Sequence, residues 1–121
     1  MLRQQRLRKR RDFATVYRKG RVFSHGLIIL RVLPNRLPHN RFGITASKAL
    51  GKAVVRNRVR RRLREGLRTL TLEPGWDIVV SARRLAAEAG YHRLLTASRS
   101  LLGRAGLLRE ERPEEREAPA R

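Results

Sequence analysis

Cysteine is absent from this chain of 121 residues, and long apolar runs are missing too. Without cysteine the chain can form no disulfide, no thiolate metal site and no cysteine nucleophile. The longest apolar run, Leu27 to Leu30, is far too short to cross a bilayer, and no apolar stretch follows the basic N-terminus as it would in a signal peptide. These absences lead us to expect a cytoplasmic protein.

Acidic side chains are also scarce. Ten Asp and Glu stand against 30 Lys and Arg, which gives a net charge of +20 at pH 7. This charge is far above what solubility requires and indicates binding to a polyanion, most simply the phosphates of nucleic acid. We expect a single RNA-binding domain over residues 1–108, with residues 1–11 as a mobile basic arm. Residues 109–121, which hold half of the acids, are predicted to be a disordered charged tail.

No catalytic or metal-binding constellation stands out. His25, His39 and His92 lie in three separate segments and lack the spacing of metal ligands. The acids of the predicted domain show no pair suited to two-metal hydrolysis. Asp77, beside Trp76, is interpreted simply as a residue at the start of a strand. The chain is therefore not expected to hydrolyse RNA by itself, although a self-sufficient nuclease stays an alternative to test.

The most informative segment is a cationic amphipathic helix predicted over residues 53–70. Its apolar stripe steps by four, four, four and three residues, through Val55, Val59, Leu63, Leu67 and Leu70. Like charges four residues apart repel, so the stack of Arg56, Arg60 and Arg64 costs stability unless a polyanion supplies the missing charge. A charged face that only contacts solvent is the simpler alternative, and the density of one sign argues against it.

The other elements are predicted from periodicity and turn residues. We expect a helix from an Asp12 N-cap to Lys19, strands over 22–33, 41–47 and 76–82, and a helix over 84–108 with Leu85 among its apolar positions and a possible break at Gly90. The resulting order, α-β-β-β-α-β-α, indicates an α+β fold. We predict a two-layer α/β sandwich in which the helices pack on one face of a small mixed sheet.

Two aromatic residues stand among cations near the N-terminus. Phe13 and Tyr17 lie one helical turn apart between Arg10-Arg11 and Arg18-Lys19. Aromatic residues at this spacing usually belong to a core, and Val16 beside them supports that interpretation. Amid cations they also form a platform on which single-stranded bases stack, at ~1–3 kcal/mol per base. The residues alone leave both interpretations open.

Several short blocks occur in a fixed order along the chain. They are Arg6-Leu7-Arg8, Asp12-Phe13, Tyr17, Gly20, Phe42-Gly43-Ile44, Ser47-Lys48, Gly51-Lys52-Ala53-Val54, Arg56-Asn57-Arg58, Arg60-Arg61, Arg64-Glu65, Asp77-Ile78-Val79-Val80 and Ala82-Arg83. Together they resemble the bacterial ribonuclease P protein component over residues 5–108, and Arg56-Asn57-Arg58 matches the RNR motif of that family.

The resemblance implies an accessory subunit of an endoribonuclease that removes the 5′ leader from precursor tRNA. Its partners would be the ribonuclease P RNA, which holds the active site, and the leader itself. Mg²⁺ would be held mainly by the RNA. The family fold also implies a left-handed β-α-β crossover around the RNR helix, against the usual right-handed rule. A ribosomal or other structural RNA-binding protein without a role in cleavage is the alternative.

The resemblance also assigns residues. The RNA-binding set is Lys52, Arg56, Asn57, Arg58, Arg60, Arg61 and Arg64. The leader-binding cleft, between the first helix and the sheet, comprises Phe13, Tyr17, Thr45, Ser47 and Arg83. No residue is expected to be catalytic or to ligate a metal. Asn57 could instead pair locally, and Arg31 stands where some relatives carry an aromatic residue, so it would add a cation if it lines the cleft.

Overall fold

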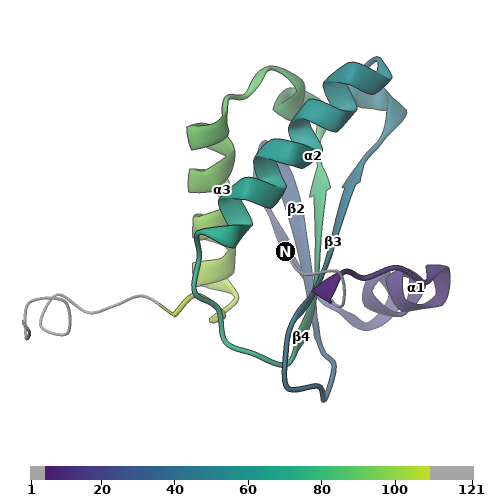
Figure 1. The fold of residues 1–121 in the computed structure, drawn as a ribbon, viewed down its shortest axis with the longest axis vertical. Coiled ribbons are helices and arrows are strands. Elements are labelled where there is room, and N and C mark those ends of the chain that lie inside the picture. Colours follow the sequence, from purple (N-terminus) through teal and green to yellow (C-terminus); the bar gives the residue numbers. More distant parts are fainter. Residues whose placement is uncertain (1–4, 110–121) are drawn as a thin grey trace, which may run out of the picture.

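The computed structural model describes residues 5–109 (Figure 1). Its elements are α1 (Arg10–Lys19), β1 (Arg21–Ser24), β2 (Ile28–Pro34), β3 (Arg41–Ala46), the short 3₁₀ helix η2 (Lys48–Leu50), α2 (Ala53–Arg68), β4 (Trp76–Ala82), the 3₁₀ helix η3 (Arg84–Glu88) and α3 (Tyr91–Arg104). The predicted α+β order is therefore confirmed, with η2 and η3 added at two strand ends.

The four strands form one mixed sheet in the order β1-β2-β4-β3. β1 and β4 both pair with β2 in antiparallel fashion, whereas β3 pairs with β4 in parallel. The parallel pair is connected through α2. In Figure 1, β3 and β4 run upward, β4 lies to the left of β3, and α2 passes in front of them. The crossover is thus left-handed, as the family resemblance implies and contrary to the usual rule.

The main core lies between the sheet and the pair α2 and α3. It contains Ile28, Leu30 and Val32 of β2, Ile78, Val80 and Ala82 of β4, Val59, Leu63 and Leu67 of α2, and Leu94, Leu101 and Leu102 of α3. Every second strand residue points to this side, as the pleat of a strand requires. The predicted apolar stripe of α2 is confirmed from Val59 to Leu67, while Leu70 lies beyond the end of the helix.

α1 packs on the opposite face of the sheet, so the prediction that all helices share one face is wrong. A second, smaller core forms there from Leu7, Val16 and Val79, with Phe13 and Leu33 partly buried against it. The apolar spacing of a helix shows that one side is buried, but it carries no information about which face of a sheet buries it. α1 and α2 therefore cover different faces of the sheet.

Two predicted helices have different limits in the structure. α1 begins at Arg10 with Lys9 as its N-cap, so Asp12 lies in the first turn and does not cap the helix. An acidic side chain in the first turn still stabilises the helix, because it lies near the positive end of the helix dipole. The long helix predicted over residues 84–108 is divided into η3 and α3, with Gly90 as the N-cap of α3. Leu85, predicted to be apolar core, is 69% exposed.

The N-terminal segment is extended and bound to the edge of the sheet. The Leu7 N–H donates to the Phe42 carbonyl at 2.8 Å, and the Leu7 side chain is buried. Because Arg10 and Arg11 already belong to α1, the extended part of the predicted basic arm ends at Lys9, before residue 11. Whether residues 1–11 are mobile stays a prediction.

The other end of the described chain is also tied down. The Arg109 N–H donates to the Thr71 carbonyl at 2.8 Å, and its guanidinium pairs with Glu73 at 3.0 Å. Residues 110–121 lie outside the described residues, so the disordered tail stays a prediction. Within residues 5–109, no helix has the length and apolar character needed to cross a membrane.

Candidate nucleic-acid interface

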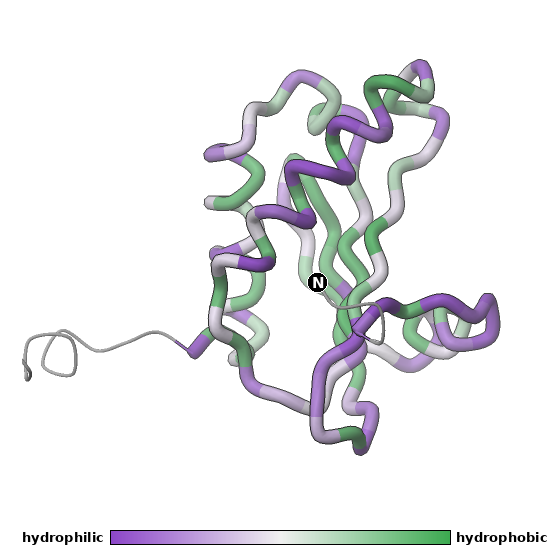
Figure 2. The backbone as a smooth tube through the Cα atoms, in the orientation of Figure 1, coloured by the Kyte–Doolittle hydropathy of each residue, from purple (hydrophilic) through white to green (hydrophobic). Residues whose placement is uncertain are grey.

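The arginines of α2 and Asn57 fall into three rows around the buried stripe of the helix. In Figure 2 the tube of α2 alternates between hydrophilic and hydrophobic stretches. Asn57, Arg61 and Arg68 are exposed and form the outward row. Arg56, Arg60 and Arg64 are half-buried and form the row nearest β3. Arg58 and Arg62 are half-buried on the other flank, next to η3. Lys52, exposed, is the N-cap of the helix.

The row nearest β3 forms no ion pair with a carboxylate of residues 5–109. Arg60 donates from Nη1 to Asn57 Oδ1 at 2.9 Å and from Nη2 to the Ala46 carbonyl at 3.3 Å. The Nε atoms of Arg56 and Arg64 are buried without a hydrogen-bond partner in the described structure. Asn57 therefore does pair locally through its oxygen, which leaves its N–H₂ group as the donor for an outside acceptor.

The row next to η3 has a different role. Arg62 Nη1 donates to the Ala89 carbonyl at 2.8 Å, and Arg58 Nη2 lies 3.4 Å from the Ala87 carbonyl. These carbonyls end a short 3₁₀ helix and need donors from outside it. Arg58, predicted to contact RNA, thus directs its guanidinium to η3, and Arg62, which the prediction left out, is the stronger tie between the two elements.

On the opposite face, α1 and two strands bring three hydroxyl groups together. Thr45 Oγ1 donates to Ser81 Oγ at 2.9 Å, and the Tyr17 hydroxyl lies 3.3 Å from the same oxygen. Tyr17 is 43% exposed, which is unusual for so large a ring. Ser81 was not predicted. It is the register partner of Thr45, a relation that appears only once the parallel pairing of β3 and β4 is known.

Arg31 lies on this same face. Its Cζ atom is 4.5 Å from the centroid of the Tyr17 ring, which is the geometry of a cation–π contact. The question left open by the sequence is therefore answered in part, because Arg31 stands beside the predicted cleft residue Tyr17. A planar guanidinium can itself stack on a base, so the cation extends the platform.

Phe13 is more deeply placed than Tyr17. Its ring packs so closely over β3 that a Cβ on Gly43 would come within 2.5 Å of Phe13 Cε1. It also contacts the small core around Val16 and Val79. The core interpretation of Phe13 is therefore supported, although its side chain is only partly buried.

Ser47 and Arg83 lie at the end of the parallel strands, one residue past the register pair Ala46 and Ala82. Ser47 Oγ accepts the Ala49 N–H at 3.3 Å and caps η2. Arg83 is exposed and donates to the His25 carbonyl at 3.1 Å. Together with Phe13, Tyr17 and Thr45, these residues form a row along β3 and β4 and do not share one compact pocket.

Comparisons with known proteins agree with this geometry. A family model described as Ribonuclease P matches residues 1–106. The chain belongs to the ribonuclease P protein family. The ribonuclease P protein component of Roseiflexus castenholzii is 43% identical over 89% of this chain and 91% of its own length, and that of Clostridium kluyveri is 37% identical over 84% and 95%.

Solved structures of ribonuclease P proteins share the fold. The Staphylococcus aureus protein superposes with a TM-score of 0.79 at 28% identity, covering 87% of this chain and 98% of that one. The Thermotoga maritima protein superposes with a TM-score of 0.75 at 28% identity, covering 82% of this chain and 96% of that one. The family and the element order predicted from the sequence are confirmed, and nothing in these comparisons favours a ribosomal protein.

Asp77 is the one well-buried acid among residues 5–109 of this ribonuclease P protein, and it pairs with Arg41. Among the described residues, Asp77 is 4% exposed and accepts from Arg41 Nε at 2.8 Å, from Arg41 Nη2 at 2.6 Å and from Asn35 Nδ2 at 2.9 Å. The hydrogen bond that Arg41 donates to Asp77 raises the pKa of Arg41. Burial opposes this rise, and the negative charges of Asp77 and Asp12 add to it. Within residues 5–109 no three His, Cys, Asp or Glu side chains cluster as metal ligands.

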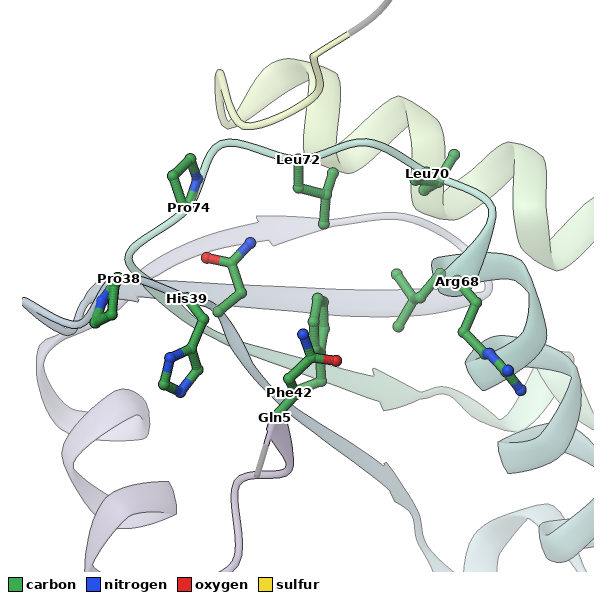
Figure 3. Close-up of a pocket in the computed structure, with 10 residues that line it drawn as sticks. Gln5, Pro38, His39, Phe42, Arg68, Leu70, Leu72 and Pro74 are labelled. Atoms are coloured by element: carbon green, nitrogen blue, oxygen red, sulfur yellow. The ribbon is translucent and has the colours of Figure 1, made fainter. Parts of the chain in front are cut away.

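A cleft of about 550 Å³ opens where α2 ends, outside both predicted sets (Figure 3). Phe42, Leu70 and Leu72 line its apolar wall, and His39 and Arg68 stand on opposite sides of it. Asn40, also in the lining, bonds to backbone groups: it donates to the Glu73 carbonyl at 2.9 Å and accepts the Trp76 N–H at 2.8 Å. The cleft continues the basic side of α2 toward the N-terminal segment of this ribonuclease P protein.

Proposed function

We propose that this chain is the protein subunit of ribonuclease P and promotes removal of the 5′ leader from precursor tRNA. The observation that carries the proposal is the family match over residues 1–106, with relatives that are themselves ribonuclease P protein components. The active site of this endoribonuclease lies in the RNA subunit, so this chain contributes binding and electrostatics. The alternative of a structural protein of the ribosome is not favoured.

The catalytic RNA is proposed to bind along α2. The outward row and the row nearest β3 supply the contacts, with Lys52, Arg56, Asn57, Arg60, Arg61 and Arg64 as the set. Two features support this: no carboxylate pairs with these guanidinium groups among the interactions described above, and the Nε atoms of Arg56 and Arg64, like that of Arg58, are buried without a partner in the described structure. Arg58 adds positive charge at the flank and also supports η3. RNA phosphates would supply the missing acceptors.

The 5′ leader is proposed to lie along the other face, over the row from Phe13 to Arg83. Tyr17 and Arg31 offer flat groups on which unpaired bases stack, and Thr45 and Ser81 offer hydroxyls for sugar or phosphate oxygens. Ser47 and Arg83 extend the path to the strand ends. A single strand suits this face, because its bases are free to stack while its backbone meets cations.

We further propose that the metal of this ribonucleoprotein is Mg²⁺, held mainly by RNA phosphates, and that the reaction takes place in the cytoplasm. A net charge of +20 would screen repulsion between phosphates of the two RNA molecules. Less Mg²⁺ would then be needed to hold the catalytic RNA and its substrate together. An unchanged Mg²⁺ dependence in the presence of the protein would argue against this role.

The proposal is tested by 5′-leader cleavage at low Mg²⁺, with a bacterial ribonuclease P RNA in the presence and absence of this chain. We expect a gain of at least tenfold that requires the RNA, and no cleavage by the chain alone. Polyarginine at the same concentration of positive charge is the control for simple screening. No gain over this control would contradict the subunit role, and cleavage without RNA would point to a self-sufficient nuclease.

A further inference from the structure

The described chain ends beside α2. Leu108 forms an antiparallel bridge with Leu72, and the Arg109 N–H donates to the Thr71 carbonyl at 2.8 Å. Figure 1 shows this end next to the segment that leaves α2. Because the pairing is antiparallel, the chain at Arg109 runs back toward the last turn of α2. The C-terminal segment, residues 110–121, is therefore attached next to the end of that helix.

The outward side of α2 carries charges of alternating sign. Arg61, Glu65 and Arg68 are all exposed, and their spacing of four and three residues places them on one side of the helix. None of the three forms an ion pair with another side chain of residues 5–109. At a rise of 1.5 Å per residue, Arg61 and Arg68 stand about 10.5 Å apart along the helix axis.

The C-terminal segment carries the opposite charges in matching order. Glu111, Arg112 and Glu114 are negative, positive and negative in turn. Pro113 favours polyproline II for the residue before it, and in that conformation Glu111 and Glu114 lie on one side, one turn and about 9 Å apart. This spacing is close to that of the two arginines on α2. The resulting pairs are Glu111 with Arg68, Arg112 with Glu65, and Glu114 with Arg61.

The attachment point favours contact with α2 over contact with α1. Glu111 lies two residues after Arg109, a reach of at most about 7 Å. The basic residues of α1 lie on the other face of the sheet, where Val16 packs against Val79. A short tether gives the segment an effective concentration in the millimolar range at its neighbour, so that even weak ion pairs form within the chain.

We propose that the C-terminal segment docks on the outward side of α2 and acts as an internal competitor of RNA. The docking needs only the charges of this chain, whereas the competition rests on the proposed function, in which RNA binds the same helix. Exposed ion pairs are individually weak and are screened by salt. The segment therefore yields to an RNA that offers many phosphates at once, and reduces occupation of α2 by weaker polyanions.

The docking is tested without RNA, in the full-length protein. Because the chain has no cysteine, a spin label on Ala118→Cys marks the C-terminal segment alone. At low salt we expect at least twofold stronger paramagnetic broadening of the Asn57 and Arg61 amides in α2 than of the Arg11 and Arg18 amides in α1. At about 1 M salt, where the screening length falls to about 3 Å, this difference should disappear.

The matched control changes the order of the charges and keeps the composition and the net charge. It combines Glu111→Arg, Arg112→Glu, Glu114→Arg and Arg116→Glu, so that each proposed pair becomes a like-charge pair. Broadening of the α2 amides should fall by at least half in this variant. Equal broadening in both proteins would overturn the docking, and so would equal broadening of α1 and α2 with the native segment.

The competition is tested by binding to ribonuclease P RNA. The variant with reordered charges should bind about threefold to tenfold more tightly than wild type at low salt and equally at high salt, because a few exposed ion pairs must first open in wild type. Glu88→Gln removes an exposed acid outside the segment and should change affinity less than twofold. Unchanged affinity despite lost docking would overturn the competition. If the proposed function failed, leader cleavage would show no gain while the spin-label result stood.

Discussion

At the scale of single residues, the pair of Arg41 and Asp77 shows most clearly how side chains tie β3 to β4. Asp77→Asn keeps the shape but removes the charge that two guanidinium nitrogens contact. We expect a loss of about 1–3 kcal/mol in the free energy of unfolding, the cost of leaving a largely buried charged group imperfectly paired. Urea unfolding followed by circular dichroism measures it.

The control for this variant is Glu73→Gln, which breaks the exposed pair with Arg109 and should cost less than about 1 kcal/mol. Equal losses would mean that burial of Asp77 contributes nothing. The raised pKa of Arg41 gives the sign of the pH effect. The stability from Arg41 is fully present below the pKa of arginine in the unfolded chain and is lost only as the pH rises through the higher folded pKa. Arg41 therefore adds no pH dependence near neutrality.

At the scale of elements, the three rows of α2 should separate binding from stability. Arg61→Ala removes an exposed cation and should weaken binding to the catalytic RNA and lower its salt slope by about 0.7–0.9, with little effect on unfolding. Arg62→Ala removes the 2.8 Å bond to the Ala89 carbonyl and should cost about 1 kcal/mol in stability. Filter binding across salt and thermal unfolding on both variants test this. If the two variants changed RNA binding and thermal unfolding equally, the rows would not differ in function.

The sequence predicted α2 well because each apolar residue of its stripe meets the same core, so the spacing alone carries the result. It could not predict the rows. Arg58 and Arg62 bond to the carbonyls of Ala87 in η3 and of Ala89 at its end. The apolar spacing of residues 84–108 had instead predicted one long helix that includes η3. Leu85 fitted that spacing yet has no partner to bury it, since side-chain periodicity does not show where the chain turns.

At the scale of the whole molecule, the sheet separates two basic surfaces. The sequence placed Tyr17 and Thr45 in one cleft only through the family resemblance, because the path of the hairpin and loop between them is specified by no local pattern. Ser81, between the two, was missed for the same reason. The face that α1 covers is also a property of the assembled fold, in which Val16 packs with Leu7 and Val79.

Because α2 and α1 lie on opposite faces, variants on the two surfaces should act independently. Tyr17→Ala should reduce affinity of the holoenzyme for leader-bearing tRNA about fivefold to 100-fold, the loss of one stacked base, and leave affinity for mature tRNA unchanged. Arg61→Ala should weaken assembly with the RNA and leave the ratio of these two affinities unchanged. In the double variant the two free-energy losses should add within about 0.5 kcal/mol, as expected for sites without shared partners.

The test is equilibrium binding of both tRNA forms to holoenzymes assembled with saturating protein, so that weaker assembly by Arg61→Ala does not imitate weaker substrate binding. Tyr17→Phe is the matched control, since it keeps the ring beside Arg31 and removes only the hydroxyl near Ser81. If the ring carries the leader contact, Tyr17→Phe should lose clearly less affinity than Tyr17→Ala, about twofold to 13-fold at most, because one hydroxyl hydrogen bond is worth about 0.5–1.5 kcal/mol. Equal losses for mature and leader-bearing tRNA in Tyr17→Ala would instead mean that the ring only supports the fold of α1 on the sheet.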